Sequence, residues 1–120
     1  MSVEHKAQAA VITCIDFRFQ EMIEEDLEKR HLNGNCDRIS WPGASKDHDK
    51  VLETTALSIR LHDPDQVYIY EHQDCGAYGP NNSVETHRQN ASHLAASLRE
   101  VKPTLEVTTL IATFEGIKPL

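Results

Sequence analysis

The hydrophobic positions of this chain form short continuous runs, separated by longer segments in which apolar residues recur at helical spacing. Residues 9–15 are an unbroken apolar run with Val11, Ile12 and Ile15, which is typical of a strand buried on both faces of a parallel sheet. Two later runs predict further strands, at residues 67–70 and 104–112. A weaker strand is expected at residues 37–41, where Pro42-Gly43 ends it.

The segments between these runs predict three amphipathic helices. Each has apolar residues on one face and a polar stop or cap at its ends. The predicted faces are Phe19, Met22, Ile23 and Leu27, ended by Asn33-Gly34-Asn35; Leu52, Ala56 and Ile59 within residues 49–61; and Ala91, Leu94, Leu98 and Val101, between a cap at Asn81-Asn82-Ser83 and Pro103.

Strands that alternate with helices of this length predict an α/β fold. We expect a parallel-stranded sheet of about four strands with helices on both faces, a Rossmann-like three-layer arrangement. The whole chain, residues 1–120, is short enough to form a single domain. In open sheets of this kind, ligands bind at the carboxyl ends of the strands.

Composition narrows the possible partners and the compartment. Nineteen acidic against twelve basic residues give a net charge of −7, and the sequence has no cluster of Lys or Arg. Nucleic acid is therefore not expected as a partner. No run approaches the roughly 18 apolar residues of a membrane span, and the amino-terminal apolar run is too short for a signal core. Three cysteines without a secretory signal favour metal or thiol chemistry over disulfides. We therefore expect a soluble, cytoplasmic protein.

The candidate chemistry lies just after two predicted strands. Cys14, Asp16 and Arg18 follow the first strand, and His72 and Cys75 follow the third. Two thiolates and one imidazole are a ligand set suited to zinc, and three protein ligands leave a fourth position for water, as in catalytic sites. The sequence thus predicts one Zn²⁺ per chain.

Less specific interpretations apply to each motif separately. A single cysteine at a strand end is commonly a small buried hydrophobe, and His-x-x-Cys occurs by chance in many chains. This interpretation is preferred for Cys36, which lies in a polar loop. Asp16 and Arg18 could be a surface ion pair, but alternation along an extended segment would direct them to the same side as Cys14.

The segments Cys14-Ile15-Asp16-Phe17-Arg18 and His72-Gln73-Asp74-Cys75-Gly76-Ala77 together resemble the paired signatures of the β-class carbonic anhydrases. The resemblance extends in pattern over residues 9–112. It implies zinc held by Cys14, His72 and Cys75, with Asp16 and Arg18 as a catalytic dyad. It also implies a homodimer or higher homo-oligomer, and hydration of carbon dioxide to bicarbonate by zinc-bound hydroxide. Water or Asp16 could be the fourth ligand.

Some positions depart from the family pattern. Phe17 stands where a small serine is usual between the Asp and the Arg, and Ser40-Trp41-Pro42-Gly43-Ala44-Ser45 replaces an expected Asn-Ala-Gly-Asn stretch. Phe17 and Trp41 are candidates for an apolar wall beside the metal. Two alternatives therefore stay open: hydrolysis of a related electrophile such as carbonyl sulfide or carbon disulfide, and a non-catalytic zinc-binding regulatory role.

A proton route to solvent would need a group that titrates near neutrality. His48 and His87 are candidates because both lie in polar segments near the expected site, although a solvated surface histidine is the commoner case. Gly76 and Gly79 are expected to serve backbone geometry in the turn after the ligands, without a chemical role.

Overall fold

The computed structural model describes residues 5–120, so the first four residues of the expected domain lie outside the described part. Its centre is one five-stranded sheet with the order β2-β1-β3-β4-β5. The first four strands are parallel, and β5 is antiparallel to β4. The strands are β1 (Ala9–Thr13), β2 (Cys36–Ser40), β3 (Gln66–His72), β4 (Glu106–Thr113) and β5 (Gly116–Pro119).

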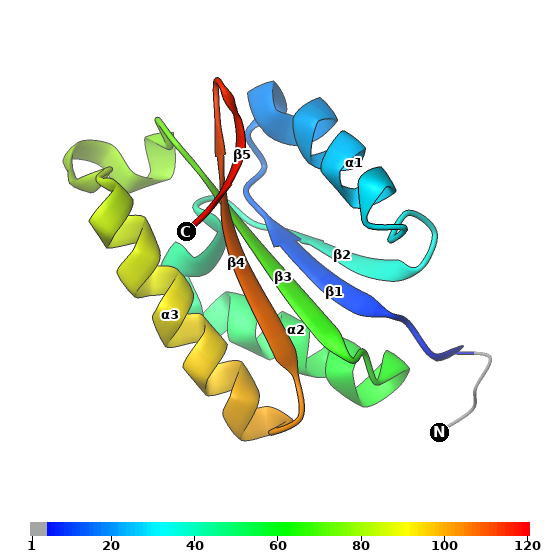
Figure 1. The fold of residues 1–120 in the computed structure, drawn as a ribbon. Coiled ribbons are helices and arrows are strands. Elements are labelled where there is room, and N and C mark those ends of the chain that lie inside the picture. Colours follow the sequence, from blue (N-terminus) through cyan, green and yellow to red (C-terminus); the bar gives the residue numbers. More distant parts are fainter. Residues whose placement is uncertain (1–4) are drawn as a thin grey trace.

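Three α-helices cover the two faces of the sheet. They are α1 (Gln20–Lys29), α2 (His48–His62) and α3 (Val84–Val101), with single 3₁₀ segments η2 (Phe17–Phe19), η3 (Ala44–Lys46) and η4 (Gly76–Asn81) at strand exits. Figure 1 shows α1 on one side of the sheet and α2 with α3 on the other. The predicted α/β fold with helices on both faces is confirmed.

Each face of the sheet has its own apolar core. Alternate residues of the strands enter each core, as the pleat of a sheet requires. Under α1 the core contains Ala9, Val11, Phe19, Ile23, Leu27, Leu32, Tyr68, Tyr70, Leu110 and Ala112. Under α2 and α3 it contains Ala10, Ile12, Ile39, Ala44, Val51, Ile59, Val67, Ile69, Ala91, Leu94, Ala95, Leu98 and Leu105.

The structure corrects three details of the predicted elements. The sheet has a fifth strand, β5, which had not been expected in the last residues of the chain. The buried face of α2 is Val51, Thr55, Ser58 and Ile59, whereas Leu52 and Ala56 are only partly buried. On α3, Val101 is exposed although Ala91, Leu94 and Leu98 are buried as predicted. Among residues 5–120, no helix combines the length and the apolar character that crossing a membrane requires.

The chain order brings the ends of β1 and β3 together. From β1 the chain passes through α1 to β2 on one flank, and it later returns through α2 to β3 on the other flank. β1 and β3 are therefore hydrogen-bonded neighbours in parallel register, with Thr13 opposite Tyr70. Because α1 and α2 lie on opposite faces, the carboxyl end between β1 and β3 is the switch point where α/β sheets place ligands.

Candidate metal centre

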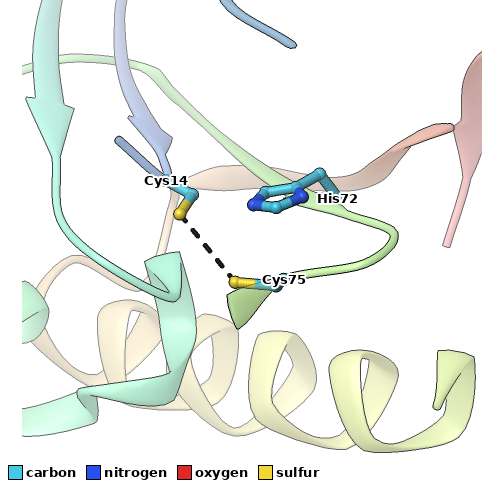
Figure 2. Close-up of side chains that lie close together, drawn as sticks. All are labelled: Cys14, His72 and Cys75. Carbon is cyan, nitrogen blue, oxygen red and sulfur yellow. Dashed lines mark hydrogen bonds between the residues drawn. The ribbon is translucent and has the colours of Figure 1, made fainter. Parts of the chain in front are cut away.

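Three potential metal ligands meet at this switch point. Cys14 directly follows β1, His72 is the last residue of β3, and Cys75 lies three residues further along. One ligand atom from each lies within 4.8 Å of the others, and the two sulfur atoms are 3.9 Å apart. Figure 2 shows the three side chains pointing toward one another. The structure thus brings together Cys14, His72 and Cys75, the three side chains that the sequence predicted as ligands.

The His72 ring is oriented for metal binding. Its Nδ1 lies 2.7 Å from the Gln73 carbonyl oxygen, so Nδ1 carries the proton and donates it. Its Nε2 is buried and has no hydrogen-bond partner among the described residues. Phe19 stacks on the ring, with 4.7 Å between the centroids. A buried, unpartnered nitrogen is costly unless something binds it, and a histidine ligand normally donates its other N–H in this way.

The two thiols differ in acidity. Burial, the largest effect, raises the pKa of Cys14, but the nearby His72 ring and hydrogen bonds with the backbone of Gly43 and Asp16 outweigh it and lower this pKa to about 7. Burial raises the pKa of Cys75 to about 11, and the neighbouring Cys14 adds to that rise. A bound cation would favour both thiolates, since metal ligation deprotonates a thiol.

Gly43 contributes a hydrogen bond to the candidate metal centre, although its sequence context indicated only the end of a strand. Its N–H donates to the Cys14 sulfur at 3.3 Å. Gly43 has φ +81°, and a Cβ there would lie 3.1 Å from the Lys46 Cβ and 3.3 Å from the Ala77 Cβ. Only glycine fits this close approach without strain. The Pro42-Gly43 pair was the available signal for such a turn.

Asp16 and Arg18 form a closely bonded pair beside the ligands. Arg18 Nη2 donates to Asp16 Oδ2 at 2.7 Å, and Arg18 Nε donates to Oδ1 at 3.1 Å. Hydrogen bonds from the Arg18 side chain, the largest effect, lower the pKa of Asp16 to about 2. Asp16 Oδ2 lies 3.9 Å from the free His72 Nε2. An ionised carboxylate therefore lies beside the candidate ligands Cys14, His72 and Cys75 (the ligand triad).

The expected proximity of the pair is correct, but the structural reason differs. Strand β1 ends at Thr13, and Asp16 caps the 3₁₀ segment η2 by accepting from the Arg18 N–H at 2.9 Å. A turn, and not strand alternation, brings Asp16 and Arg18 together. Gln20 secures this turn because its amide donates to the carbonyls of both Cys14 and Asp16, at 2.9 Å each.

Arg18 also bonds Asp74, which lies between the candidate ligands His72 and Cys75. It donates to the Asp74 carboxylate at 3.0 Å and to the Asp74 carbonyl at 2.9 Å. Asp74 has φ +56°, a left-handed conformation that costs about 1–2 kcal/mol for an ordinary L-residue. Arg18 thus links the segment after β1 to the segment after β3 and helps to hold the strained residue next to Cys75.

Several other candidates lie differently from expectation. Phe17 is 85% exposed, so it does not wall the ligand triad. Trp41 lines a pocket of about 330 Å³ together with Pro42, Lys46, Asp47 and Ala77. Cys36 is half-buried and is the first residue of β2, not part of a polar loop as expected, and it lies outside the group of Cys14, His72 and Cys75. Of the two glycines, Gly79 has a positive φ of 56°, whereas a Cβ at Gly76 would meet no atom within 4 Å.

The two histidines proposed for proton transfer do not contact the ligand triad. His48 bonds Asp49 and Ser97, each at 2.9 Å, and stacks on His93. His87 is only 1% exposed, so the interpretation as a solvated surface histidine is wrong for it. Both of its ring nitrogens are bonded within the protein, to Glu71 and Asn82.

Comparison with known proteins identifies the family. The sequence profile described as "Putative carbonic anhydrase" matches residues 4–116, which is nearly the whole chain. The chain belongs to this carbonic anhydrase family. The resemblance found in the two sequence motifs is thereby confirmed at the level of the family.

Relatives of this carbonic anhydrase family member are distant in sequence. An uncharacterised protein of Rickettsia conorii is 26% identical over 94% of this chain and 71% of its own length. A second uncharacterised protein, from Rickettsia bellii, is 24% identical over 94% of this chain and 80% of its own length. Neither name assigns an activity.

Solved structures share the fold of this family member. A carbonic anhydrase from Streptococcus mutans superposes with a TM-score of 0.72 at 14% identity, covering 99% of this chain and 84% of that one. A carbonic anhydrase from Glaciozyma antarctica gives 0.68 at 14% identity, over 98% and 85% of the two chains. The apo form of a carbon disulfide hydrolase gives 0.64 at 12% identity, over 96% and 79%. At such identities the likeness concerns the fold.

Proposed function

We propose that this protein is a zinc enzyme that hydrates carbon dioxide to bicarbonate. The observation that carries the proposal is the buried, unpartnered His72 Nε2, which faces two thiols and has an ionised carboxylate 3.9 Å away. Two sulfurs and one imidazole nitrogen suit zinc, and three protein ligands leave a position for substrate chemistry. When bound, zinc would act as a Lewis acid and supply a nucleophilic oxygen from water near neutral pH.

The protein residues would each have a distinct role in this reaction. Cys14, His72 and Cys75 would hold the metal. Asp16 would accept a hydrogen bond from the attacking water and orient it, because Arg18 keeps the carboxylate ionised and fixed. In the structure Arg18 retains Asp16, so the arrangement favours water over Asp16 as the fourth ligand.

The homodimer implied by the sequence resemblance belongs to the same proposal. Three exposed apolar side chains, Ile15, Phe17 and Phe114, lie on the segments that carry or contact Arg18, and they are 58%, 85% and 57% exposed. A second copy of the chain would cover them. Sedimentation velocity at several protein concentrations tests this: a dimer is expected, and Phe17→Glu should shift the distribution toward monomer. A monomer at every concentration would contradict the dimer.

The decisive experiment is stopped-flow hydration of carbon dioxide by protein whose zinc content has been measured. We expect one zinc per chain and a rate that rises from acidic to alkaline pH, because deprotonation of the attacking water generates the nucleophile. Full zinc content with no hydration at any pH would refute the proposal. Turnover of carbonyl sulfide or carbon disulfide would then indicate a hydrolase, and inactivity on all three would indicate a non-catalytic zinc protein.

A further inference from the structure

A buried polar cluster lies on the opposite face of the sheet from His72. It is behind residues 72–75, which carry His72 and Cys75 and form the ligand segment. Glu71 precedes His72 in β3, and alternation along the strand directs its side chain toward α3. The Glu71 side chain is 1% exposed. It accepts four hydrogen bonds: from the Ser45 N–H at 3.1 Å, the Ser45 hydroxyl at 2.6 Å, the Tyr78 hydroxyl at 2.7 Å and His87 Nδ1 at 2.7 Å. These four donors fill the acceptor positions of a carboxylate.

His87 connects Glu71, by way of Asn82, to the ligand segment. It lies in α3, stacks on Tyr78 with 3.8 Å between the centroids, and donates to Glu71 through Nδ1. Its Nε2 is then an acceptor, 2.7 Å from the Asn82 amide nitrogen when that amide is oriented to donate. In the same orientation, the Asn82 oxygen accepts from the N–H of Asp74 at 3.0 Å and from the N–H of Cys75 at 2.9 Å.

The donors and acceptors of this cluster therefore run in one direction. Backbone N–H groups of the ligand segment donate to Asn82, Asn82 donates to His87, and His87 donates to Glu71. Asp74 is the residue with the left-handed backbone conformation, and Cys75 is a candidate ligand. A left-handed aspartate persists where its surroundings determine its conformation.

We propose that Glu71, His87 and Asn82 are positioning residues that hold the Asp74–Cys75 segment in its metal-binding conformation before the metal arrives. The inference rests on the proposed metal centre and adds to it, because these side chains do not bond the sulfur atoms of Cys14 and Cys75 or Nε2 of His72. Outer hydrogen bonds of this kind commonly change metal affinity by about 10–100-fold.

Cobalt binding to Asn82→Ala tests the positioning role. The substitution removes the acceptor for both N–H groups, so we expect cobalt affinity, measured by competition with a chromophoric chelator, to fall about 10–100-fold. The thiolate-to-cobalt absorption should also shift, because the Cys75 sulfur is no longer held. Asn82→Asp keeps an oxygen acceptor for the two N–H groups but loses the amide donor to His87, so it should recover part of the affinity.

Asn90→Ala is the matched control. Asn90 is also a partly buried asparagine, and it donates to the Tyr78 hydroxyl at 3.2 Å, at the end of the cluster away from the ligand segment. Its replacement removes one hydrogen bond of the same buried cluster and none to the Asp74–Cys75 segment, so it should leave cobalt affinity within about twofold. Equal losses of affinity in Asn82→Ala and Asn90→Ala would show a merely structural effect and overturn the inference.

Metal binding by the unaltered protein distinguishes failure of this inference from failure of the proposed function. If it binds no cobalt or zinc, the metal centre itself is refuted, and the positioning role with it. If it binds cobalt and Asn82→Ala binds equally well with the same spectrum, only the positioning role is refuted. Amide hydrogen exchange in the metal-free protein provides a test without any substitution: the Asp74 and Cys75 amides should be protected, and exchange at the rate of exposed amides would overturn the inference.

Discussion

At the scale of single residues, the centre depends on hydrogen bonds that leave particular atoms free. His72 donates through Nδ1 and leaves Nε2 unpartnered, whereas Asp16 is bonded on both oxygens by Arg18. The first arrangement prepares a ligand, and the second prepares a fixed negative charge. These two properties can be tested separately.

Asp16→Asn separates catalysis from metal binding. An asparagine cannot supply the ionised acceptor that orients the attacking water, so we expect carbon dioxide hydration to fall at least about 100-fold while zinc content stays at one per chain. Stopped-flow assays with parallel zinc analysis measure both quantities. Asp49→Asn is the control, because the Asp49 side chain is 97% exposed and, within residues 5–120, bonds only His48. Unchanged turnover in Asp16→Asn would contradict a catalytic role.

Arg18→Gln should change the titration of Asp16. Arg18 lowers the pKa of Asp16 to about 2, so its removal should bring that pKa up toward the ordinary value of about 3.9. A depressed pKa stabilises the folded protein above the unfolded-state value, and this contribution is lost as pH falls from about 4 through about 2. Carboxyl-carbon NMR titration measures the shift, and Arg38→Gln, which removes the partner of Glu24, is the control. An unmoved Asp16 pKa would show that other groups keep it ionised.

The candidate site was largely visible in the sequence because its residues are chemically distinctive. Cys14, His72 and Cys75 follow predicted strands, and neighbouring parallel strands end at the same edge. The sequence indicated only a strand stop at Gly43 and a helix cap at Asn82. The partner of Gly43, Cys14, is 29 residues away, and the contacts of Asn82 depend on a turn geometry that composition does not encode. Backbone N–H donors, and side-chain amides that connect two segments, are not marked by any pattern of residue types in the sequence.

At the scale of elements, the prediction succeeded where burial alone determines the pattern. The apolar run of β1 and the α1 face with Phe19, Ile23 and Leu27 are buried as expected. α2 differs because Thr55 and Ser58 occupy its buried face and their hydroxyls are hydrogen-bonded within the protein: Thr55 donates to the Val51 carbonyl in the same helix, and Ser58 donates to Asp37 in β2. The spacing of apolar residues does not identify buried helix positions that are occupied by polar side chains.

The two edge strands were the hardest elements to predict. β2 exposes polar residues because it has a single neighbour, β1. β5 has only four residues, including Pro119, and is stabilised by pairing with β4 and by the Thr113 hydroxyl, which donates to the Gly116 carbonyl. Edge strands bury little, so their hydrophobic signal is weak.

Helix α3 offers a stability test of the predicted core. Leu94 is fully buried against the sheet, so Leu94→Ala should lower the free energy of unfolding by about 2–5 kcal/mol. Urea denaturation of the metal-free protein measures the change. Val101→Ala lies on the same helix, where Val101 is 46% exposed, and should stay within about 0.5 kcal/mol. A similar loss in both variants would indicate that α3 packs differently from the structure.

At the scale of the whole molecule, the proposed metal ligands come from segments that are distant in the chain and follow two neighbouring strands, β1 and β3. A ligand that binds only the folded protein stabilises it, by about 2.7 kcal/mol when its free concentration is one hundred times the dissociation constant. Zinc should therefore raise the melting temperature of the entire protein, not only order the ligand segment.

Cys75→Ser tests this coupling between zinc and folding. The substitution removes one sulfur ligand, so bound zinc should fall well below one per chain and the zinc-dependent rise in melting temperature should disappear. Elemental analysis and calorimetry, with and without a chelator, measure the two effects. Cys36→Ser is the control, since Cys36 lies outside the ligand group. Undiminished zinc in Cys75→Ser would refute Cys75 as a ligand.

The separation of the ligands along the chain has a consequence for the newly made protein. Cys14 and Cys75 are 61 residues apart and meet only when β3 pairs with β1. At synthesis rates of about 5–20 residues per second, Cys14 leaves the ribosome roughly 3–12 s before Cys75 does. During that interval the nascent chain holds Cys14 without Cys75, so the complete set of proposed ligands can capture zinc only after Cys75 has also left the ribosome.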